Sequence, residues 1–309
     1  MGQGGQIMSK KMMIAGCTGI CLLLTSVAHG AGGDAGKVLP QTSNEAAVQQ
    51  HAEMQSARQQ ITAEAIRDKM LNAIDYYTTI QGTYRIMQKP LGVDDVVEFD
   101  VSVGDTPGSY VKVKSNVTGK QSEHISNGET MIHLYEQEKA FVKQQKIKTV
   151  TKESKIQKGP RYYIDEEGIP VYEYRKDPSY AHEAHDVIFP QAYGFWLYRH
   201  PHKVVGTEPY LDRTAVVLVG TLSGILAEKH QASRFKMWVD QETGVLLKLL
   251  ETDDKGTVSN QIEVLRLAID KEIDTSKFQI IEPKGWKDIS PDLSKKREVR
   301  ADSSDKEAK

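Results

Sequence analysis

The sequence holds very little cysteine and none of the common catalytic motifs. Its 309 residues include two cysteines, Cys17 and Cys21, and both lie in one apolar segment near the N-terminus. It has no Gly-x-Ser-x-Gly elbow, no glycine-rich phosphate loop and no His-Glu-x-x-His pair. A chain that has lost the N-terminal segment has no thiol, which excludes disulfide and thiol chemistry. We therefore expect a protein that is not an enzyme and needs no cofactor.

The sequence also lacks an excess of charge of either sign. The formal net charge is −2, with 27% charged and 39% hydrophobic residues. These are ordinary values for a soluble protein with an apolar core. Without a basic excess, nothing favours a nucleic-acid partner.

One apolar segment, residues 12–28, follows two lysines and precedes small residues that would allow cleavage near Gly30. This order is typical of a secretory signal peptide, so residues 1–30 are expected to be removed on export. The mature protein would then be periplasmic or extracellular. A retained membrane anchor is the alternative, although the segment is short for a span. The letters "IAGC", which end at Cys17, resemble a lipoprotein-processing box, so lipidation of Cys17 is a further alternative.

A helix is predicted after a polar linker. Residues 31–58 are rich in Gly, Ala, Gln, Ser and Asn, a composition typical of flexible segments. Four apolar residues then recur at helical spacing, with Thr62 as a candidate N-cap. These four residues are Ile66, Met70, Ile74 and Tyr77.

From Gly82 onward the pattern is that of antiparallel strands. Residues 234–270 contain three apolar segments, and the polar turns 241–244 and 253–256 separate them. An Asn127-Gly128 turn predicts a further hairpin. The segments 216–222 and 245–250 are apolar on both faces of the expected strands, so another layer or an apolar ligand must cover their second face.

An insertion at residues 161–202, rich in Tyr, His and Pro, interrupts the strands and is expected to carry short helices. The predicted fold is therefore α+β, with a large curved antiparallel sheet, an unclosed half-barrel, and helices on its concave side. We assign residues 59–282 to this domain and residues 283–309 to a charged, disordered tail.

Aromatic residues of the insertion are candidates to line a cavity inside the half-barrel. A gate over an apolar cavity is one interpretation. The alternative is that they are core residues that pack the insertion onto the sheet. The candidate residues, with two from the strands, are Phe189, Tyr193, Phe195, Trp196, Trp238 and Leu247.

Histidines of the same insertion are weak candidates for a metal site. His182 and His185 would share one face of a helix, and His202 could complete the set of ligands. The alternative is a polar, solvent-facing segment. Because the spacing is loose, we predict no metal site.

Four segments resemble one superfamily, the LolA-type lipoprotein carriers and the RseB/MucB-type envelope-stress regulators. The segments are "YTTIQGTYRI", "ISNGETMIHLYEQEKAFV", "VVGTEPYLDRTAVVLVG" and "RFKMWVDQETGVLLKLLETDDKGTV". The likeness covers about residues 60–282. It implies an unclosed β-barrel with helices as a lid, whose concave face holds or senses acyl chains or parts of lipoproteins. The regulators of this superfamily also bind an anti-sigma partner.

Three functions are consistent with these observations. The first is an exported, non-catalytic protein that binds a lipid or the acyl chains of a lipoprotein in the half-barrel, as carrier or sensor. The second is an envelope regulatory or scaffold protein whose partner is a membrane protein. The third is a metal-dependent enzyme that uses residues 182–202. We expect the first.

Overall fold

The computed structural model describes residues 61–144 and 160–290. The predicted signal peptide and linker lie outside the described residues, as do residues 291–309 of the predicted tail.

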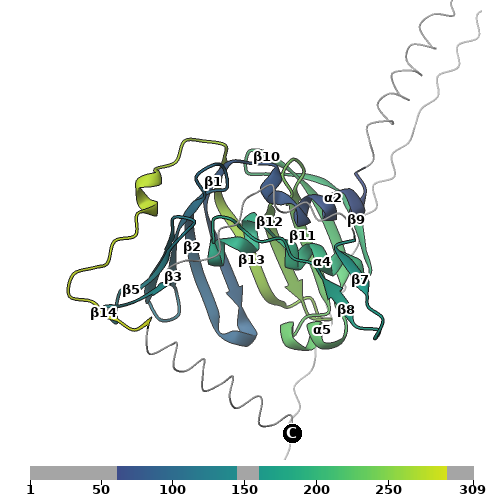
Figure 1. Cartoon of the computed structure of the whole chain (residues 1–309). Helices are drawn as coiled ribbons and strands as arrows, with labels where there is room; N and C mark the ends of the chain where they lie inside the picture. The colour runs from purple at the N-terminus through teal and green to yellow at the C-terminus, as the bar shows by residue number, and fades with distance from the viewer. Residues whose placement is uncertain (1–60, 145–159, 291–309) are drawn as a thin grey trace, which may run out of the picture. The chain divides into compact units, whose positions relative to one another are not determined.

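Twelve strands form one sheet in the order β14-β6-β5-β4-β3-β2-β1-β13-β12-β11-β10-β9 (Figure 1). Neighbouring strands are antiparallel except for β14 and β6. Strand β1 lies between β2 and β13, and thereby joins the two halves of the sheet. The strands are β1 (Thr79–Gln88), β2 (Val93–Ser102), β3 (Gly108–Ser115), β4 (Gln121–Ser126), β5 (Met131–Tyr135), β6 (Ala140–Gln144), β9 (His202–Tyr210), β10 (Arg213–Thr221), β11 (Arg234–Asp240), β12 (Leu246–Thr252), β13 (Val258–Ile269) and β14 (Lys287–Asp288).

The sheet is curved and open, and helices lie against its concave face (Figure 1). The helical elements are α2 (Ala63–Leu71), η1 (Ala73–Asp75), η2 (Lys89–Leu91), η4 (His182–Ala184), α3 (His185–Ile188), α4 (Gln191–Arg199), α5 (Gly224–His230) and η5 (Thr275–Phe278). One hydrophobic core joins residues of α2, α3 and α4 with residues of the strands. The predicted α+β half-barrel with helices on its concave side is confirmed.

Helix α2 begins where the sequence predicts. The Thr62 side chain accepts a hydrogen bond from the Ala65 N–H at 3.1 Å, which caps the first turn. The helix ends at Leu71, so Ile74 lies in η1 and Tyr77 follows it, but all four predicted apolar residues are buried. Gly194 lets α4 approach closely, because a Cβ there would lie 3.1 Å from Leu71 Cδ2.

The predicted three-strand meander is β11, β12 and β13. Phe235, Met237 and Val239 are buried on the concave face, and the intervening Lys236 and Trp238 lie on the convex face because strand side chains alternate. The predicted Asn127-Gly128 turn connects β4 to β5, as expected.

An ion pair between a buried guanidinium and an exposed carboxylate attaches the predicted insertion to η1. The Arg175 guanidinium, 2% exposed, donates to both carboxylate oxygens of Asp75, and also to Asn72 Oδ1 at 2.7 Å. Arg161 donates to the carbonyl of Leu71 at 3.2 Å. These contacts hold the small hairpin of β7 (Tyr162–Ile164) and β8 (Pro170–Tyr172) beside the first helix.

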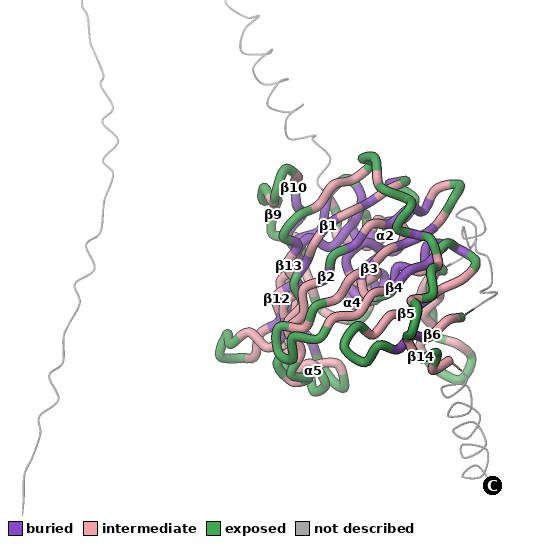
Figure 2. The backbone as a smooth tube through the Cα atoms, turned by 90° about the vertical axis from the view of Figure 1, so that its left-hand side faces the viewer, coloured by how far each residue is buried: buried purple, intermediate pink, exposed green. Residues whose placement is uncertain are grey.

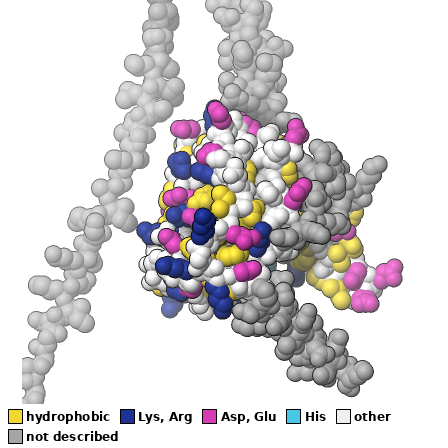
Figure 3. All heavy atoms as spheres, turned by 60° about the vertical axis from the view of Figure 1, so that its left-hand side comes forward, with side chains coloured by type: hydrophobic (Ala, Val, Ile, Leu, Met, Phe, Trp, Pro, Cys, Tyr) yellow, Lys and Arg dark blue, Asp and Glu magenta, His cyan; other side chains and the backbone are white. Residues whose placement is uncertain are grey.

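The outer surface differs from this interior. Burial in Figure 2 is concentrated where helices and strands face one another, while the loops are exposed. On the face shown in Figure 3, positive and negative side chains are intermixed. The pair of Arg85 with Asp94 on β1 and β2 is one example, with Nε to Oδ1 at 2.7 Å.

The boundary predicted at residue 282 is too early. Strand β14 pairs in parallel with β6, and Trp286 and Ile280 pack against Ile125, Ile132 and Phe141 on the convex face. The charged composition of residues 283–309 concealed Trp286, which together with Ile280 covers the outer face of β4–β6. Residues 283–290 are therefore not a disordered tail.

The two turns of the meander provide a matched test of the helix packing. Gly244 and Gly256 both have positive φ, +77° and +82°, which favours glycine. A Cβ on Gly244 would lie 2.4 Å from the Lys69 carbonyl carbon of α2, whereas a Cβ on Gly256 would meet nothing within 4 Å. Lys69 Nζ also donates to the Gln241 carbonyl at 2.6 Å.

We expect Gly244→Ala to lower the free energy of unfolding by about 3 kcal/mol, because backbone strain adds to displacement of α2. Gly256→Ala should cost about 1 kcal/mol, from the backbone alone. Urea unfolding followed by circular dichroism measures both values. Equal losses would show that the turn does not support α2.

Candidate functional site

Four of the six predicted cavity residues fill the concave side instead of leaving it open. Phe189 and Leu247 are fully buried, and Tyr193 and Trp196 are 8% and 9% exposed, all in the core between the helices and the sheet. The Trp196 ring lies 6.0 Å from the Phe235 ring of β11. The space predicted for a ligand is occupied here by the chain's own side chains. A role for these residues in contacting a ligand stays a prediction.

Phe195 lies in a different place. Its ring is 5.2 Å from the Tyr172 ring and 4.8 Å from the Tyr174 ring, so it packs against the hairpin of the insertion. A cavity of about 200 Å³ lies there, between α4, the segment 172–174 and Leu226 of α5.

Trp238 lies on the convex face of the sheet, away from the other five candidates. Its Nε1 donates to the Glu208 carboxylate at 2.6 Å. Lys236 Nζ lies 4.3 Å from the centre of its ring and Lys248 Nζ lies 5.6 Å from it. The indole is therefore held between cationic side chains on the outer surface. The six candidates do not surround one common cavity.

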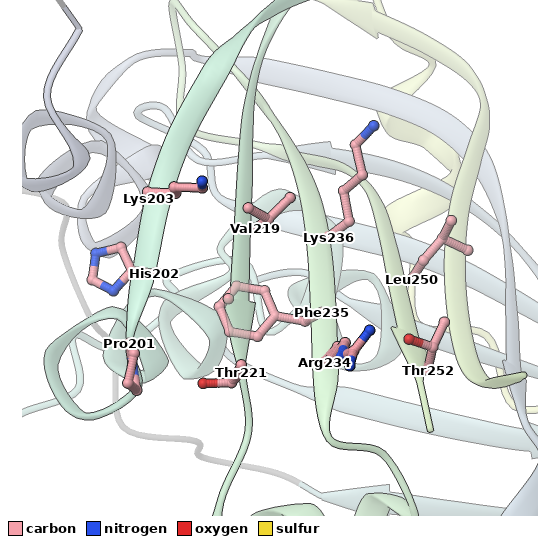
Figure 4. A pocket seen from close by; sticks show the side chains of 11 residues that line it. Pro201, His202, Lys203, Val219, Thr221, Arg234, Phe235, Lys236, Leu250 and Thr252 are labelled. Atoms are coloured by element: carbon pink, nitrogen blue, oxygen red, sulfur yellow. The ribbon is translucent and has the colours of Figure 1, made fainter. Parts of the chain in front are cut away.

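A groove of about 640 Å³ lies on this convex face. Strand register builds it from two rows of side chains. Lys203, Val219, Lys236 and Leu250 lie side by side across β9, β10, β11 and β12. The second row, two residues further along the strands, consists of Thr221, Arg234 and Thr252. Figure 4 shows these side chains on their four strands.

The groove combines apolar and cationic surface. Val219 and Leu250 provide aliphatic side chains, while Lys203, Arg234 and Lys236 provide three positive charges. Lys236 Nζ has an acidic partner, Glu208 Oε1 at 3.2 Å. Neither Lys203 nor Arg234, both exposed, forms an ion pair with another residue in ranges 61–144 and 160–290. The volume lies in the range of about 300–1,000 Å³ that is typical of small-molecule sites.

The sequence analysis missed this groove. Alternation along the strand puts Lys236 on the face opposite Phe235, but register across β9–β12 is needed to bring it beside Lys203 and Leu250. The only local sign of this groove in the sequence is a cation at every second strand position, as at Arg234 and Lys236.

The three candidate metal ligands are not brought together. Among the residues that the structure describes, only His124, His182 and Glu183 place three potential ligand atoms within 4.8 Å of one another. The His185 ring instead lies 5.2 Å from the Phe189 ring. His202, the first residue of β9, has its Nδ1 2.7 Å from the carbonyl oxygen of His200. A metal-dependent enzyme built on residues 182–202 therefore lacks its expected geometry.

The histidine that joins His182 comes from the sheet. His124 on β4 lies against His133 on β5, with ring centres 3.9 Å apart. Burial lowers the pKa of His124. Burial, and then the neighbouring His124, lower the pKa of His133 to about 4. Burial raises the pKa of Glu183, but hydrogen bonds from His124 and His182 outweigh it and hold that pKa well below its usual range.

One segment of the chain is similar to a known family. Residues 225–281, from α5 through the meander, match the family model of the MucB/RseB N-terminal domain. The resemblance to the MucB/RseB-type proteins is thereby confirmed over this segment. No curated protein sequence matches the chain.

Solved structures of low identity are also similar. A chain of the Pseudomonas aeruginosa MucA/MucB complex has 16% identity and a TM-score of 0.40, covering 71% of this chain and 61% of that chain. Lipoprotein LppX of Mycobacterium tuberculosis has 11% identity and a TM-score of 0.35, covering 69% and 97%. An uncharacterised Thermus thermophilus protein has 9% identity and a TM-score of 0.36, covering 72% and 96%. The match thus spans less than two thirds of the first of these chains.

A search of the described helices for a membrane span finds none that is both long and apolar enough to cross a bilayer.

The lowered pKa of His133 predicts a stability change with pH. In the unfolded chain its pKa is near the ordinary 6.5, and in the folded chain it is about 4. The unfolded state therefore binds more protons in this window, so the stabilisation is complete above pH 6.5 and is lost as pH falls toward 4. Its charged or titratable neighbours are His124, His182 and Glu183.

We expect stability to fall by on the order of 1–2 kcal/mol over this range, after allowance for solvent screening of a partly open ring. The variant His133→Gln should show a smaller slope of unfolding free energy against pH, because it lacks a group that binds a proton in the unfolded chain but not in the folded one. Urea titrations at several pH values, without added metal, measure the slope. An unchanged slope in the variant would show that His133 is not held neutral.

Proposed function

We propose that the chain is an exported, non-catalytic envelope protein that binds a lipid with an acidic headgroup in the groove on the convex face of β9–β12. The observation that carries this proposal is the position of two exposed cations, Lys203 and Arg234, beside the aliphatic Val219 and Leu250; neither cation has an ion-pair partner in the part of the chain that the structure describes. An amphipathic anion complements both kinds of surface at once.

The two parts of such a ligand would be stabilised in different ways. Each methylene of an acyl chain that leaves water on Val219 and Leu250 gains about 0.8 kcal/mol at full burial. The groove is open, so the gain per methylene is smaller. The acidic headgroup would accept charge-assisted hydrogen bonds from Lys203 and Arg234. Thr221 and Thr252, beside Arg234, offer hydroxyl groups to the same headgroup.

Two further observations support a binding role in the envelope. Residues 225–281, which match the MucB/RseB N-terminal domain, include two of the four groove strands, β11 and β12. The sequence also starts with a predicted signal peptide and contains none of the three catalytic motifs considered above. Carrier and sensor are both compatible with such a site.

A regulatory protein with a membrane-protein partner is the second candidate, and strand β9 favours it. In the described part of the sheet, β9 is an edge strand next to the groove. An acidic, extended segment of a partner could pair with this edge and contact Lys203. The register shift near Gly206 and the presence of Pro209 shorten the part of β9 whose backbone can hydrogen-bond to another strand.

Oleate and oleyl alcohol test the lipid proposal, because they share a chain and differ in the charge of the headgroup. We expect the full chain to bind oleate, and the double variant Lys203→Gln/Arg234→Gln to bind it about tenfold more weakly, a loss of about 1.4 kcal/mol. The double variant should bind oleyl alcohol as the unaltered chain does. Isothermal titration calorimetry at low salt measures these affinities.

Lys114→Gln is the matched control, since Lys114 is an exposed strand lysine on β3, outside the groove. It should leave oleate binding unchanged. Equal oleate affinity in the double variant and the unaltered chain would contradict the proposal. Binding of an acidic peptide but not of oleate would instead favour the regulatory candidate.

A further inference from the structure

A second cluster of side chains lies at the other end of the sheet and on its concave face. His124 of β4 pairs across the sheet with Val111 of β3, whose side chain is in the core, so both face the helices. The element η4 brings His182 and Glu183 to this face. The ring of His124 then lies 3.6 Å from the ring of His182 and 3.9 Å from the ring of His133.

The potential ligand atoms of three of these residues converge. Glu183 Oε2 lies 3.5 Å from His124 Nδ1 and 3.4 Å from His182 Nδ1. Zinc bonds to imidazole nitrogen and carboxylate oxygen are about 2.0–2.2 Å long, so the ligand atoms of a tetrahedral site are separated by about 3.3–3.5 Å. The separations of Glu183 Oε2 from the two histidine nitrogens therefore match the distance between ligand atoms in a tetrahedral zinc site.

The electrostatics of the cluster also suit a cation. Within the described ranges, no lysine or arginine pairs with the Glu183 carboxylate, and its two ion-pair partners are His124 and His182. Imidazoles balance the carboxylate charge only when they are protonated. Neutral imidazoles present lone pairs instead, and a carboxylate together with imidazole nitrogens is a ligand set typical of zinc.

Hydrogen bonds from the sheet fix the backbone around His182 and Glu183. The hydroxyl of Tyr84, a fully buried residue of β1, donates to the Glu183 carbonyl at 2.6 Å. Ser109 on β3 donates to the Ser179 carbonyl at 2.9 Å, just before η4. His182 itself has φ of +49°, a conformation that a non-glycine residue adopts at a cost. Contacts to two separate strands therefore fix the backbone that carries two of the three groups.

The cluster is open on one side. The His124 side chain is 7% exposed, whereas those of His182 and Glu183 are 50% and 36% exposed. An ion could enter from solvent and keep a water molecule as its fourth ligand. The His133 ring, 3.9 Å from that of His124 and 4.4 Å from that of Tyr135, would orient the His124 ring.

We propose that His124, His182 and Glu183 form a binding site for a divalent transition-metal ion of the zinc type. The inference does not depend on the lipid proposal, because the groove lies on the convex face of β9–β12. It also differs from the metal site considered from sequence, which grouped His182 with His185 and His202.

Zinc titration of the chelator-treated full chain tests this site by calorimetry. We expect one zinc ion per chain, bound with micromolar or tighter affinity. His182→Asn is the sharpest variant, since asparagine tolerates positive φ and the side chain is half exposed. Glu183→Gln keeps the carbonyl that Tyr84 contacts. Each variant should weaken zinc binding at least tenfold.

His230→Asn is the matched control. His230 Nδ1 lies 2.7 Å from Glu251 Oε2, so it is another histidine–glutamate pair, but without a second imidazole in the described residues. This variant should leave the zinc affinity unchanged. Thermal unfolding by circular dichroism confirms that each variant is folded.

Copper(II) binding gives a second readout. It would not differ between the unaltered chain and the variants if His182 had only a structural role. Electron paramagnetic resonance of the copper-loaded chain should show nitrogen coupling from imidazole, reduced in His182→Asn and retained in His230→Asn. Zinc affinity and copper spectra that are the same in the unaltered chain, His182→Asn and Glu183→Gln would overturn the proposal. Absence of zinc binding by the unaltered chain would overturn it as well.

Discussion

Burial of the concave face of the sheet against α2 and α4 is the constraint on which the rest of the structure depends. A curved antiparallel sheet with apolar residues on both faces has to cover the concave one. Here Ile66, Met70, Tyr193 and Trp196 cover it. Gly194 permits the two helices to approach each other, and the Arg175–Asp75 pair fastens the insertion to η1. Surfaces that remain available for binding therefore lie outside this core.

Two such surfaces remain, and they are far apart in the order of strands. The groove uses the convex face of β9–β12, where register places Lys203 and Lys236 in one row with Val219 and Leu250. The histidine cluster uses the concave face of β4 and β5, covered by η4. We propose that the first binds an amphipathic anion and the second a cation, which would give one sheet two sites of opposite chemistry.

The sequence predicted those parts of the fold that depend on local pattern. Alternation identified the meander from Arg234 to Asp270, and helical spacing with Thr62 identified α2. The sites depend on contacts between distant residues, which local pattern does not contain. His124 reaches His182 across 58 positions in the chain, and Trp238 faces away from Leu247 because of strand parity and a register shift near Val239. Trp286, which packs on the convex face, was hidden by the charged residues of the predicted tail.

The chain's own side chains fill the concave face, and we propose that an acidic lipid binds on the convex face. Photo-crosslinking with a diazirine-bearing fatty acid, followed by mass spectrometry of the labelled peptides, tests it most directly. Labels in the strands of the groove, within residues 203–221 and 234–252, are the predicted result. Labels confined to residues 187–197, which carry Phe189, Tyr193 and Trp196, would contradict the account, because they would place the ligand between the helices and the sheet.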